Sequence, residues 1–544
     1  MHAFPSSLLL ACAVLLFASV AVAEQTVRTV ALSGQSAPSS IGGQFGNFSG
    51  LSLNDRGQVA FAGTVRETMH PTDGFIGSGF WLAGPNGSLS NVIVSDDPIP
   101  EAGASARFGR VRSGGGAQPP GAGLGNGSRN SLMLNDFGDV VIRGSFSWPN
   151  GAADEDPLAT GVLRWSHRSG VSPVVQIGRA LPGENGEMVT LRAIDRIAID
   201  ENGAVNVIGL LVDAFEGGIW RAASGSTIEP RFVPGSFAGN DPPVEIDIVR
   251  TLEIARPRFT DKGGFVAAAG QPFGVWAERD GVAPQLIATS ASPAPVAGLN
   301  GEFFTGFFSP TISNNGDIAF LSTFSLDPGG GPLRNHALFV DQGQGALEIV
   351  ARVDDRIDSD TKSYRLASLI RPGLQSISAA DDGQLVVNAH IDPLDNPAEQ
   401  ELQTILVQSA DGQLKPLAIE GDPTPRLPGR QFESFEDVRI SGSGQVVFTA
   451  VTARGGGSHD SLWAQDPNGD LQLVAHVGGV LDVNDNPDIQ DERTISAMTF
   501  RGLNGSPDLF DINDAGEVAF MVSFTDGTSG VFVSRVAAIP EPGT

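Results

Sequence analysis

A run of acidic and amide side chains near the end of the chain has the composition of a calcium-binding loop. Residues 482–488 read Asp-Val-Asn-Asp-Asn-Pro-Asp, and Asp491 and Glu492 follow closely. Ca²⁺ prefers about six to eight oxygen ligands from carboxylates, amides and carbonyls. The sequence therefore predicts a Ca²⁺ loop; the competing interpretation is a solvated acidic loop between two strands. The predicted ligands are Asp482, Asn484, Asp485, Asn486 and Asp488.

The other residues that could do chemistry form no recognisable set. The histidines at 70, 167, 336, 390, 459 and 476 lack the spacing of zinc ligands. His459-Asp460-Ser461 has the residue types of a catalytic triad, but consecutive residues cannot converge into one, and the segment is interpreted as a turn. The glycine-rich stretch 114–121 lacks the Lys-Ser/Thr ending of a phosphate loop. We assign no catalytic or cofactor-binding residue from the sequence.

Composition restricts the class of protein. The 544 residues include 62 acidic and 34 basic side chains, a formal net charge of −28, and such a surface repels nucleic acid. The chain has 69 glycines and 36 prolines, which is too many for a helical protein, while 41% hydrophobic residues suffice for a core. These numbers predict a large, acidic, turn-rich globular protein, and we expect a monomer.

The first 23 residues are predicted to be a signal peptide. An apolar run over Leu8–Val22 ends in Ala21-Val22-Ala23, which fits a signal-peptidase site. The only cysteine, Cys12, lies in this run, so the mature chain has no disulfide. No later segment has the length of apolar sequence that crosses a bilayer. We expect an exported protein, secreted or at the cell surface.

A tandem repeat runs through the rest of the chain. Each copy has an apolar residue, a short polar turn ending in Gly, and then alternating apolar residues, as in Leu53–Phe61 and Ile512–Phe520. The copies recur about every 66 residues. The eight turn glycines are Gly57, Gly138, Gly203, Gly263, Gly316, Gly383, Gly444 and Gly516.

The repeat predicts a hairpin closed by a tight turn. Asn, Asp or Ser three places before the Gly can bond its own backbone, and the Gly then takes a positive φ in a bulge. Six places after the Gly the residue is small in seven copies, which indicates close packing against a neighbour. Further strands follow each turn and the last of them returns to the next turn, so each predicted unit runs from one turn to the next. The aromatic residues of these strands, such as Trp81 and Trp463, are interpreted as core filling.

Four antiparallel strands per unit predict an all-β, eight-bladed β-propeller. The chain after the signal peptide begins with strand-like Thr26–Leu32 and ends after Gly530–Val533, so the two ends complete one shared blade. The alternative is an open array or two smaller propellers. The predicted domains are the signal peptide (1–23), the propeller (24–536) and a C-terminal tail (537–544).

The Asn-x-x-Gly-x-x-Ala-Phe copies at Asn54–Phe61 and Asn513–Phe520 resemble the choice-of-anchor tandem-repeat proteins named for that motif. The tail Ile539–Thr544 resembles the opening of a PEP-CTERM sorting signal, without its apolar span and Arg-rich end. This resemblance implies an exported bacterial protein and supplies no catalytic residues.

We therefore expect a non-enzymatic propeller that binds a polysaccharide or protein ligand, or acts as a scaffold, at the cell surface or in the extracellular matrix. The alternative is a secreted glycoside hydrolase or lyase whose active site lies on the propeller axis, with two carboxylates and aromatic platforms. The only cofactor that the sequence indicates is Ca²⁺.

Overall fold

A computed structural model gives the fold of the chain. It describes residues 26–67, 74–102, 106–109, 132–147, 159–184, 186–212, 217–223, 227–233, 237–238, 244–245, 258–261, 263–269, 273–279, 282–290, 293–294, 301–326, 335–343, 346–359, 361–370, 377–395, 401–455, 457–486, 488–498 and 510–536. Within these ranges the regular structure is β-strand, apart from one 3-10 turn, η1 (Pro100–Ala102). No helix in the described ranges has the length and apolar character needed to cross a membrane. The predicted signal peptide and C-terminal tail lie outside them.

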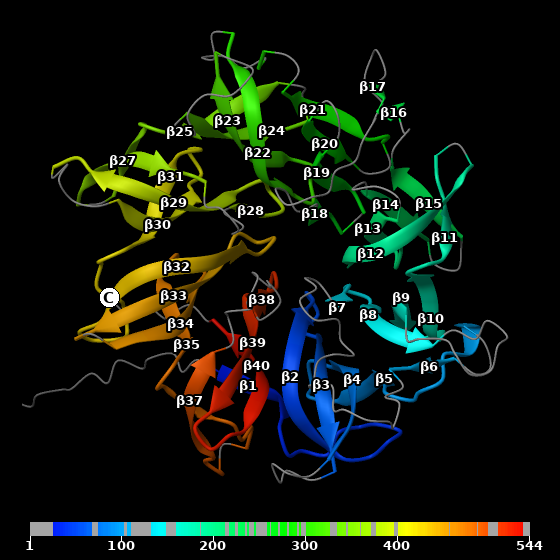
Figure 1. Ribbon diagram of the computed structural model, residues 1–544. Coiled ribbons are helices and arrows are strands. Elements are labelled where there is room, and N and C mark those ends of the chain that lie inside the picture. Colours follow the sequence, from blue (N-terminus) through cyan, green and yellow to red (C-terminus); the bar gives the residue numbers. More distant parts are fainter. Residues whose placement is uncertain are drawn as a thin grey trace, which may run out of the picture.

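Eight antiparallel sheets are arranged in a ring, so the protein is an eight-bladed β-propeller, as predicted (Figure 1). Blade 1 consists of β2 (Gln44–Leu53), β3 (Val59–Arg66), β4 (Phe75–Ala83) and β5 (Leu89–Val94). Blade 2 consists of β6 (Arg107–Phe108), β7 (Leu132–Leu134), β8 (Val140–Ser147), β9 (Ala159–Ser166) and β10 (Gly170–Gln176). Blade 3 consists of β11 (Ala180–Pro182), β12 (Met188–Ile199), β13 (Val205–Leu211), β14 (Gly217–Ala222) and β15 (Ile228–Phe232).

A small hairpin, β16 (Phe237–Ala238) and β17 (Val244–Glu245), precedes blade 4. Blade 4 consists of β18 (Arg258–Phe259), β19 (Phe265–Ala269), β20 (Gly274–Glu278) and β21 (Gln285–Thr289). Blade 5 consists of β22 (Phe303–Ile312), β23 (Ile318–Ser325), β24 (His336–Asp341) and β25 (Leu347–Arg352). Blade 6 consists of β26 (Arg356–Asp358), β27 (Ser363–Ser368), β28 (Ile377–Ala379), β29 (Leu385–Pro393), β30 (Leu402–Gln408) and β31 (Leu414–Ile419).

Blade 7 consists of β32 (Gln431–Ile440), β33 (Val446–Arg454), β34 (Gly457–Gln465) and β35 (Leu471–His476). Blade 8 takes β36 (Val480–Asp482), β37 (Glu492–Met498), β38 (Phe510–Ile512), β39 (Glu517–Phe524) and β40 (Ser529–Arg535) from the C-terminal end and β1 (Thr26–Leu32) from the N-terminal end. β1 pairs antiparallel with β40, from Thr26 opposite Arg535 to Leu32 opposite Gly530. This pairing confirms that both ends of the chain share one blade and close the ring.

The strand before each turn is the innermost strand of its blade. β2, β18, β22 and β32 stand at the edges of their sheets, and β7, β28 and β38 occupy the inner place where the inner strand is interrupted (Figure 1). β12 pairs with the short strand β11 near its start and with β13 over the rest of its length. The sequence-based unit began at the turn and ran through to the next turn. That boundary is wrong, because the strand before each turn pairs with the strand after it. A blade therefore begins in the connection that precedes its inner strand.

The hydrophobic core lies between neighbouring blades. One cluster joins Met521 and Val531 of blade 8 to Phe61 and Trp81 of blade 1. Trp81, Trp220, Trp276 and Trp463 are fully buried, which confirms that the aromatic residues fill the core. The small residues six places after the turn glycines also pack closely, since a Cβ on Gly144 would lie 2.6 Å from the Phe108 ring.

A second repeated element connects the blades at the end opposite the turns. In six connections a residue with positive φ donates its N–H to the carbonyl of a buried residue of the next inner strand, at 2.7 to 3.0 Å. The donors are Gly34, Asp96, Gly178, Asp354, Gly421 and Gly478, and the acceptors are Phe45, Phe108, Leu191, Leu366, Phe432 and Ile495. This element was not predicted from the sequence.

Candidate functional site

All eight predicted turns have the same geometry and gather around the propeller axis. In each, the Gly N–H donates to the carbonyl three residues earlier, as from Gly57 to Asn54 at 3.0 Å. The φ angles of the eight turn glycines lie between 71° and 90°. In seven turns the side chain of the first residue accepts from the backbone N–H four residues later, as Asn54 Oδ1 does from Gln58 at 2.9 Å, whereas Ala380 of blade 6 has no side-chain acceptor. These observations confirm the predicted turn and bulge.

The glycines also let adjacent blades approach each other. A Cβ on Gly263 of blade 4 would lie 2.7 Å from Arg221 Nη1 and 2.9 Å from Asp200 Oδ2, both in blade 3. A Cβ on Gly203 would similarly meet Arg164 of blade 2 at 2.4 Å. At seven of the eight turn glycines a Cβ would come within 3.0 Å of the preceding blade, and at Gly316 the nearest atom is 3.4 Å away, so the glycine serves both the backbone angle and, in seven turns, the contact between blades.

The second residue of each turn forms a ring of hydrogen bonds between blades. Acidic side chains occupy this place in six blades, Asn314 in blade 5 and Gly442 in blade 7. The N–H of Asp55 donates to Asp136 Oδ1 at 2.8 Å, and the N–H of Asp514 donates to Asp55 Oδ1 at 2.8 Å. We call these residues the axial ring: Asp55, Asp136, Glu201, Asp261, Asn314, Asp381, Gly442 with Ser443, and Asp514.

Every neighbouring pair of blades contributes one such bond, so the ring is closed. Glu201 Oε1 accepts from the N–H of Asp136 at 3.1 Å, and Asn314 Oδ1 accepts from the N–H of Asp261 at 3.0 Å. Blade 7 lacks the side chain, and there the Gly442 carbonyl accepts from Asp381 while the Ser443 N–H donates to Asp514 Oδ1. The remaining bonds run from the Glu201 N–H to the Asp261 carbonyl and from Asn314 Nδ2 to Asp381 Oδ1.

The first turn residue adds a second set of bonds where it is asparagine. Asn513 Nδ2 donates to the Asn54 carbonyl at 3.0 Å, and Asn54 Nδ2 donates to the Asn135 carbonyl at 2.8 Å. Asn135 Nδ2 continues to the Asp200 carbonyl at 2.9 Å. The three asparagines thereby link blades 8, 1, 2 and 3.

Three carboxyl groups of the axial ring have raised pKa values. For each of them, loss of hydration on burial is the main cause that raises the pKa, and the neighbouring carboxylates raise it further. Backbone or amide N–H donors favour the charged form and lower the pKa in part. The pKa of Glu201 rises to about 7, and those of Asp55 and Asp261 rise to about 6. Groups in this range can exchange protons near neutral pH.

The predicted Ca²⁺ loop connects β36 to β37 in the closing blade. Its side chains accept local backbone N–H groups, as Asp482 Oδ1 does from Asn484 and Asp491 at 3.0 Å each. Asp485 Oδ1 accepts from the N–H of Thr29 on β1 at 2.8 Å, and Asn484 Oδ1 and Asn486 Oδ1 accept from the N–H groups of Asn486 and Asp488. Within the described ranges no three His, Cys, Asp or Glu side chains gather as metal ligands. The Ca²⁺ loop stays a prediction.

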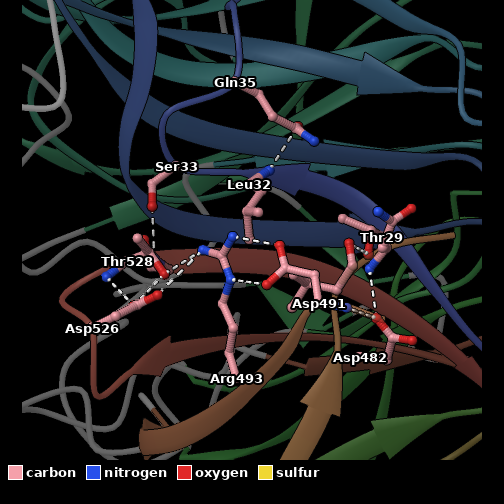
Figure 2. Close-up of polar contacts among 12 residues, drawn as sticks. Thr29, Leu32, Ser33, Gln35, Asp482, Asp491, Arg493, Asp526 and Thr528 are labelled. Carbon is pink, nitrogen blue, oxygen red and sulfur yellow. Dashed lines mark hydrogen bonds and ion pairs between the residues drawn. The ribbon is translucent and has the colours of Figure 1, made fainter. Parts of the chain in front are cut away.

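Arg493 holds the base of this loop against the last hairpin (Figure 2). Its guanidinium pairs with Asp491 at 2.8 Å and donates to Thr528 Oγ1 at 2.8 Å. The hydrogen bonds that Arg493 donates to Asp491 lower the pKa of that carboxyl group. Thr29 on β1 lies beside the same loop (Figure 2), so the region holds together segments from both ends of the chain.

The other candidate residues are dispersed. His459-Asp460-Ser461 lies within β34 rather than in a turn, which corrects the sequence interpretation, and Ser461 Oγ donates to the Ala450 carbonyl at 2.8 Å. His336 is buried and its Nε2 accepts from the N–H of Leu369 at 2.9 Å. His70 and the stretch 114–121 lie outside the described residues.

A family model matches almost the whole chain, over residues 14–100 and 101–544. The model is that of DUF7453, a family of unknown function. The chain belongs to this family. No curated protein matches it in sequence.

Solved structures similar to this DUF7453 chain include one propeller and two polysaccharide lyases, all of low sequence identity. The Dos1 propeller is 9% identical, with 76% of this chain and 94% of that chain covered and a TM-score of 0.32. The polysaccharide lyase Uly1 is 10% identical, with 81% and 96% covered and a TM-score of 0.35. An ulvan lyase of family PL25 is 10% identical, with 77% and 95% covered and a TM-score of 0.33.

The two ends of the DUF7453 propeller differ in surface character. We call the end with the axial turns the turn face and the opposite end the loop face. Of nine large apolar side chains exposed among the described residues, seven lie at the loop-face ends of strands or in the connections there. These seven are Phe75, Met188, Val212, Leu326, Leu394, Val480 and Ile489. The other two, Phe137 and Val282, lie in turns of the turn face.

Proposed function

We propose that this protein is an exported binding or scaffold protein whose loop face docks a protein partner at the cell surface or in the extracellular matrix. The observation that supports this is the contrast between the two faces: seven of the nine exposed large apolar side chains of the described residues lie on the loop face, on blades 1, 3, 5, 6 and 8. A protein partner that covers the loop face would bury apolar side chains from several blades at once, as the cores of protein interfaces do. Six of these seven side chains are aliphatic or Met, and such side chains are better suited to contact with a protein than to stacking on a sugar ring.

The position of the chain ends also supports the loop face as the docking face. Thr26 pairs with Arg535, and the Val536 N–H donates to the Gly516 carbonyl of an axial turn, so both ends of the described propeller lie at the turn face. An attachment through either end therefore leaves the loop face directed outward. The loops on that face are supported by a propeller closed on itself, which is the usual arrangement of a binding site on a rigid scaffold.

Two matched pairs of variants test this proposal. The mature protein, which begins at residue 24, is immobilised and crosslinked to the extracellular proteins that bind it. The partner found in this way is purified and titrated against each variant. We expect Met188→Ser with Leu326→Ser to weaken binding at least about tenfold, because each removes a desolvated apolar contact. Phe137→Ser with Val282→Ser, on the turn face, should leave binding unchanged. Equal effects of the two pairs, or binding only to glycans on an array with or without Ca²⁺, would overturn the proposal.

The axial ring favours a second candidate, an enzyme that acts on a polysaccharide at the axis. The observation behind it is the carboxyl group of Glu201, whose pKa of about 7 suits a general acid or base. Incubation with a panel of acidic and neutral polysaccharides should then release shorter chains, and Glu201→Gln should abolish the release. If no polysaccharide is cleaved, the enzyme hypothesis fails while the loop-face proposal is untouched.

A further inference from the structure

The axial ring brings like charges together at the point where all blades meet. Asp55 faces Asp514 and Asp136 from the adjacent turns and Asp261 from across the ring. Asp261 in turn faces Asp381, Asp136 and Asp514. Among the described residues near the ring, Arg56 places its guanidinium over the Phe137 ring at 5.0 Å, and Arg28 donates to the carbonyls of Gly57 and Gly84. The ring therefore joins the blades with groups that repel each other when ionised.

We propose that the axial ring makes closure of the propeller depend on pH, with the ring tightest in mildly acidic solution and weaker at neutral pH and above. The hydrogen bonds do not require the charge, because a neutral carboxyl keeps a carbonyl oxygen that accepts the same N–H. Asn314 demonstrates this within the molecule: its neutral amide oxygen accepts from the N–H of Asp261 as the acids do elsewhere. Ionisation thus adds repulsion while adding no new partner between blades.

The direction of the effect follows from the raised pKa values. Asp55, Glu201 and Asp261 hold protons more tightly in the folded ring than in the unfolded chain. Between about pH 4 and pH 7 the folded state therefore binds more protons, and the free energy of unfolding falls as the pH rises through this window. Burial also raises the pKa of Asp317 and Asp422 and lowers that of His476, and these groups contribute a background that ring variants leave in place.

The test compares amide variants that keep the hydrogen-bond acceptor but remove the charge. Calorimetry of the mature protein should show a melting temperature about 2–5 °C lower at pH 8 than at pH 5, allowing for solvent screening of partly exposed groups. The triple variant Asp55→Asn, Glu201→Gln, Asp261→Asn should lose at least half of that difference. A control with the same change in net charge, Glu67→Gln, Glu101→Gln, Glu348→Gln, should keep it.

Two further measurements separate charge from hydrogen bonding. Asp55→Ala removes the acceptor of the Asp514 N–H and should lower the melting temperature at both pH values, unlike Asp55→Asn. Added NaCl should raise the melting temperature at pH 8 more than at pH 5, because salt screens the repulsion. If the triple variant unfolds, Glu201→Gln alone replaces it in the pH comparison. The proposal is overturned if the ring variant and the control variant show the same pH dependence.

Discussion

The turn face and the loop face of this propeller solve different problems with the same eight repeats. At the turn face, equivalent backbone atoms form equivalent bonds within each turn, and most adjacent blades are linked by a bond between a side chain and the backbone. At the loop face, the connections differ in length and carry most of the exposed apolar side chains. Repetition therefore serves closure at one end, and variation at the other end is available for recognition.

The largest effect is expected from removing the strand that closes the ring. β1 contributes the buried residues Val30, Ala31 and Leu32, and Arg28 donates to the Gly57 carbonyl of blade 1. A chain that begins at residue 34 leaves β40 as an open edge, and we expect it to lose cooperative unfolding. Thermal unfolding followed by circular dichroism measures this, and a peptide of residues 24–33 should restore the transition. Unfolding at the parent temperature without the peptide would show that the ring does not depend on β1.

The next effect in size distinguishes the glycines of the two faces. Gly263 (φ 89°) and Gly527 (φ 84°) both have positive φ, but a Cβ would meet Arg221 and Asp200 at the first and nothing within 4 Å at the second. Gly527→Ala should cost about 1 kcal/mol from backbone strain alone. Gly263→Ala should cost about 2–4 kcal/mol, because the methyl group also separates a buried ion pair. Urea unfolding gives both values, and equal costs would show that turn glycines do not set the spacing of the blades.

A smaller effect is expected from Ca²⁺ on the closing blade. If the loop after β36 binds Ca²⁺ with a dissociation constant of about 0.1–1 mM, 5 mM Ca²⁺ should stabilise the protein by about 1–2 kcal/mol. Mg²⁺ at the same concentration is the control, and Asn484→Ala with Asp488→Ala should remove the effect. Asp485 is left unchanged because it holds the Thr29 N–H. No calorimetric signal with Ca²⁺ would leave the loop as a solvated acidic connection.

Periodicity made the ring, the turns and the shared blade predictable from the sequence. The apolar residue, the polar turn and the Gly recur in one register, and that register is what a closed ring requires. The axial ring was missed although its signal was present: Asp or Glu follows the first turn residue in six of eight copies. These acids were left without an interpretation, since a single sequence does not show that the side chain reaches the next blade.

The second repeated element was hidden for a different reason. Gly34, Gly178, Gly421 and Gly478 take positive φ in the connections between blades, but Asp96 and Asp354 stand in the same structural place. Because Asp is among the residues that tolerate this conformation, the position is not marked by glycine alone. The two innermost segments of blades 2, 6 and 8 were likewise unpredicted, since long insertions separate them.

The smallest effect tests this equivalence directly. Asp96 has a φ of 68°, and its N–H donates to the Phe108 carbonyl at 2.7 Å as Gly34 does to Phe45 at 2.8 Å. Asp96→Gly should keep that bond and relieve the strain, while the freer unfolded chain offsets part of the gain, so we expect a stabilisation of at most about 0.5 kcal/mol. Asp96→Val should instead destabilise by about 1–2 kcal/mol, because a β-branched residue is strained at positive φ. Urea unfolding of the two variants decides the matter: if Gly destabilises as much as Val does, the Asp96 side chain contributes something that the four glycine connections do without.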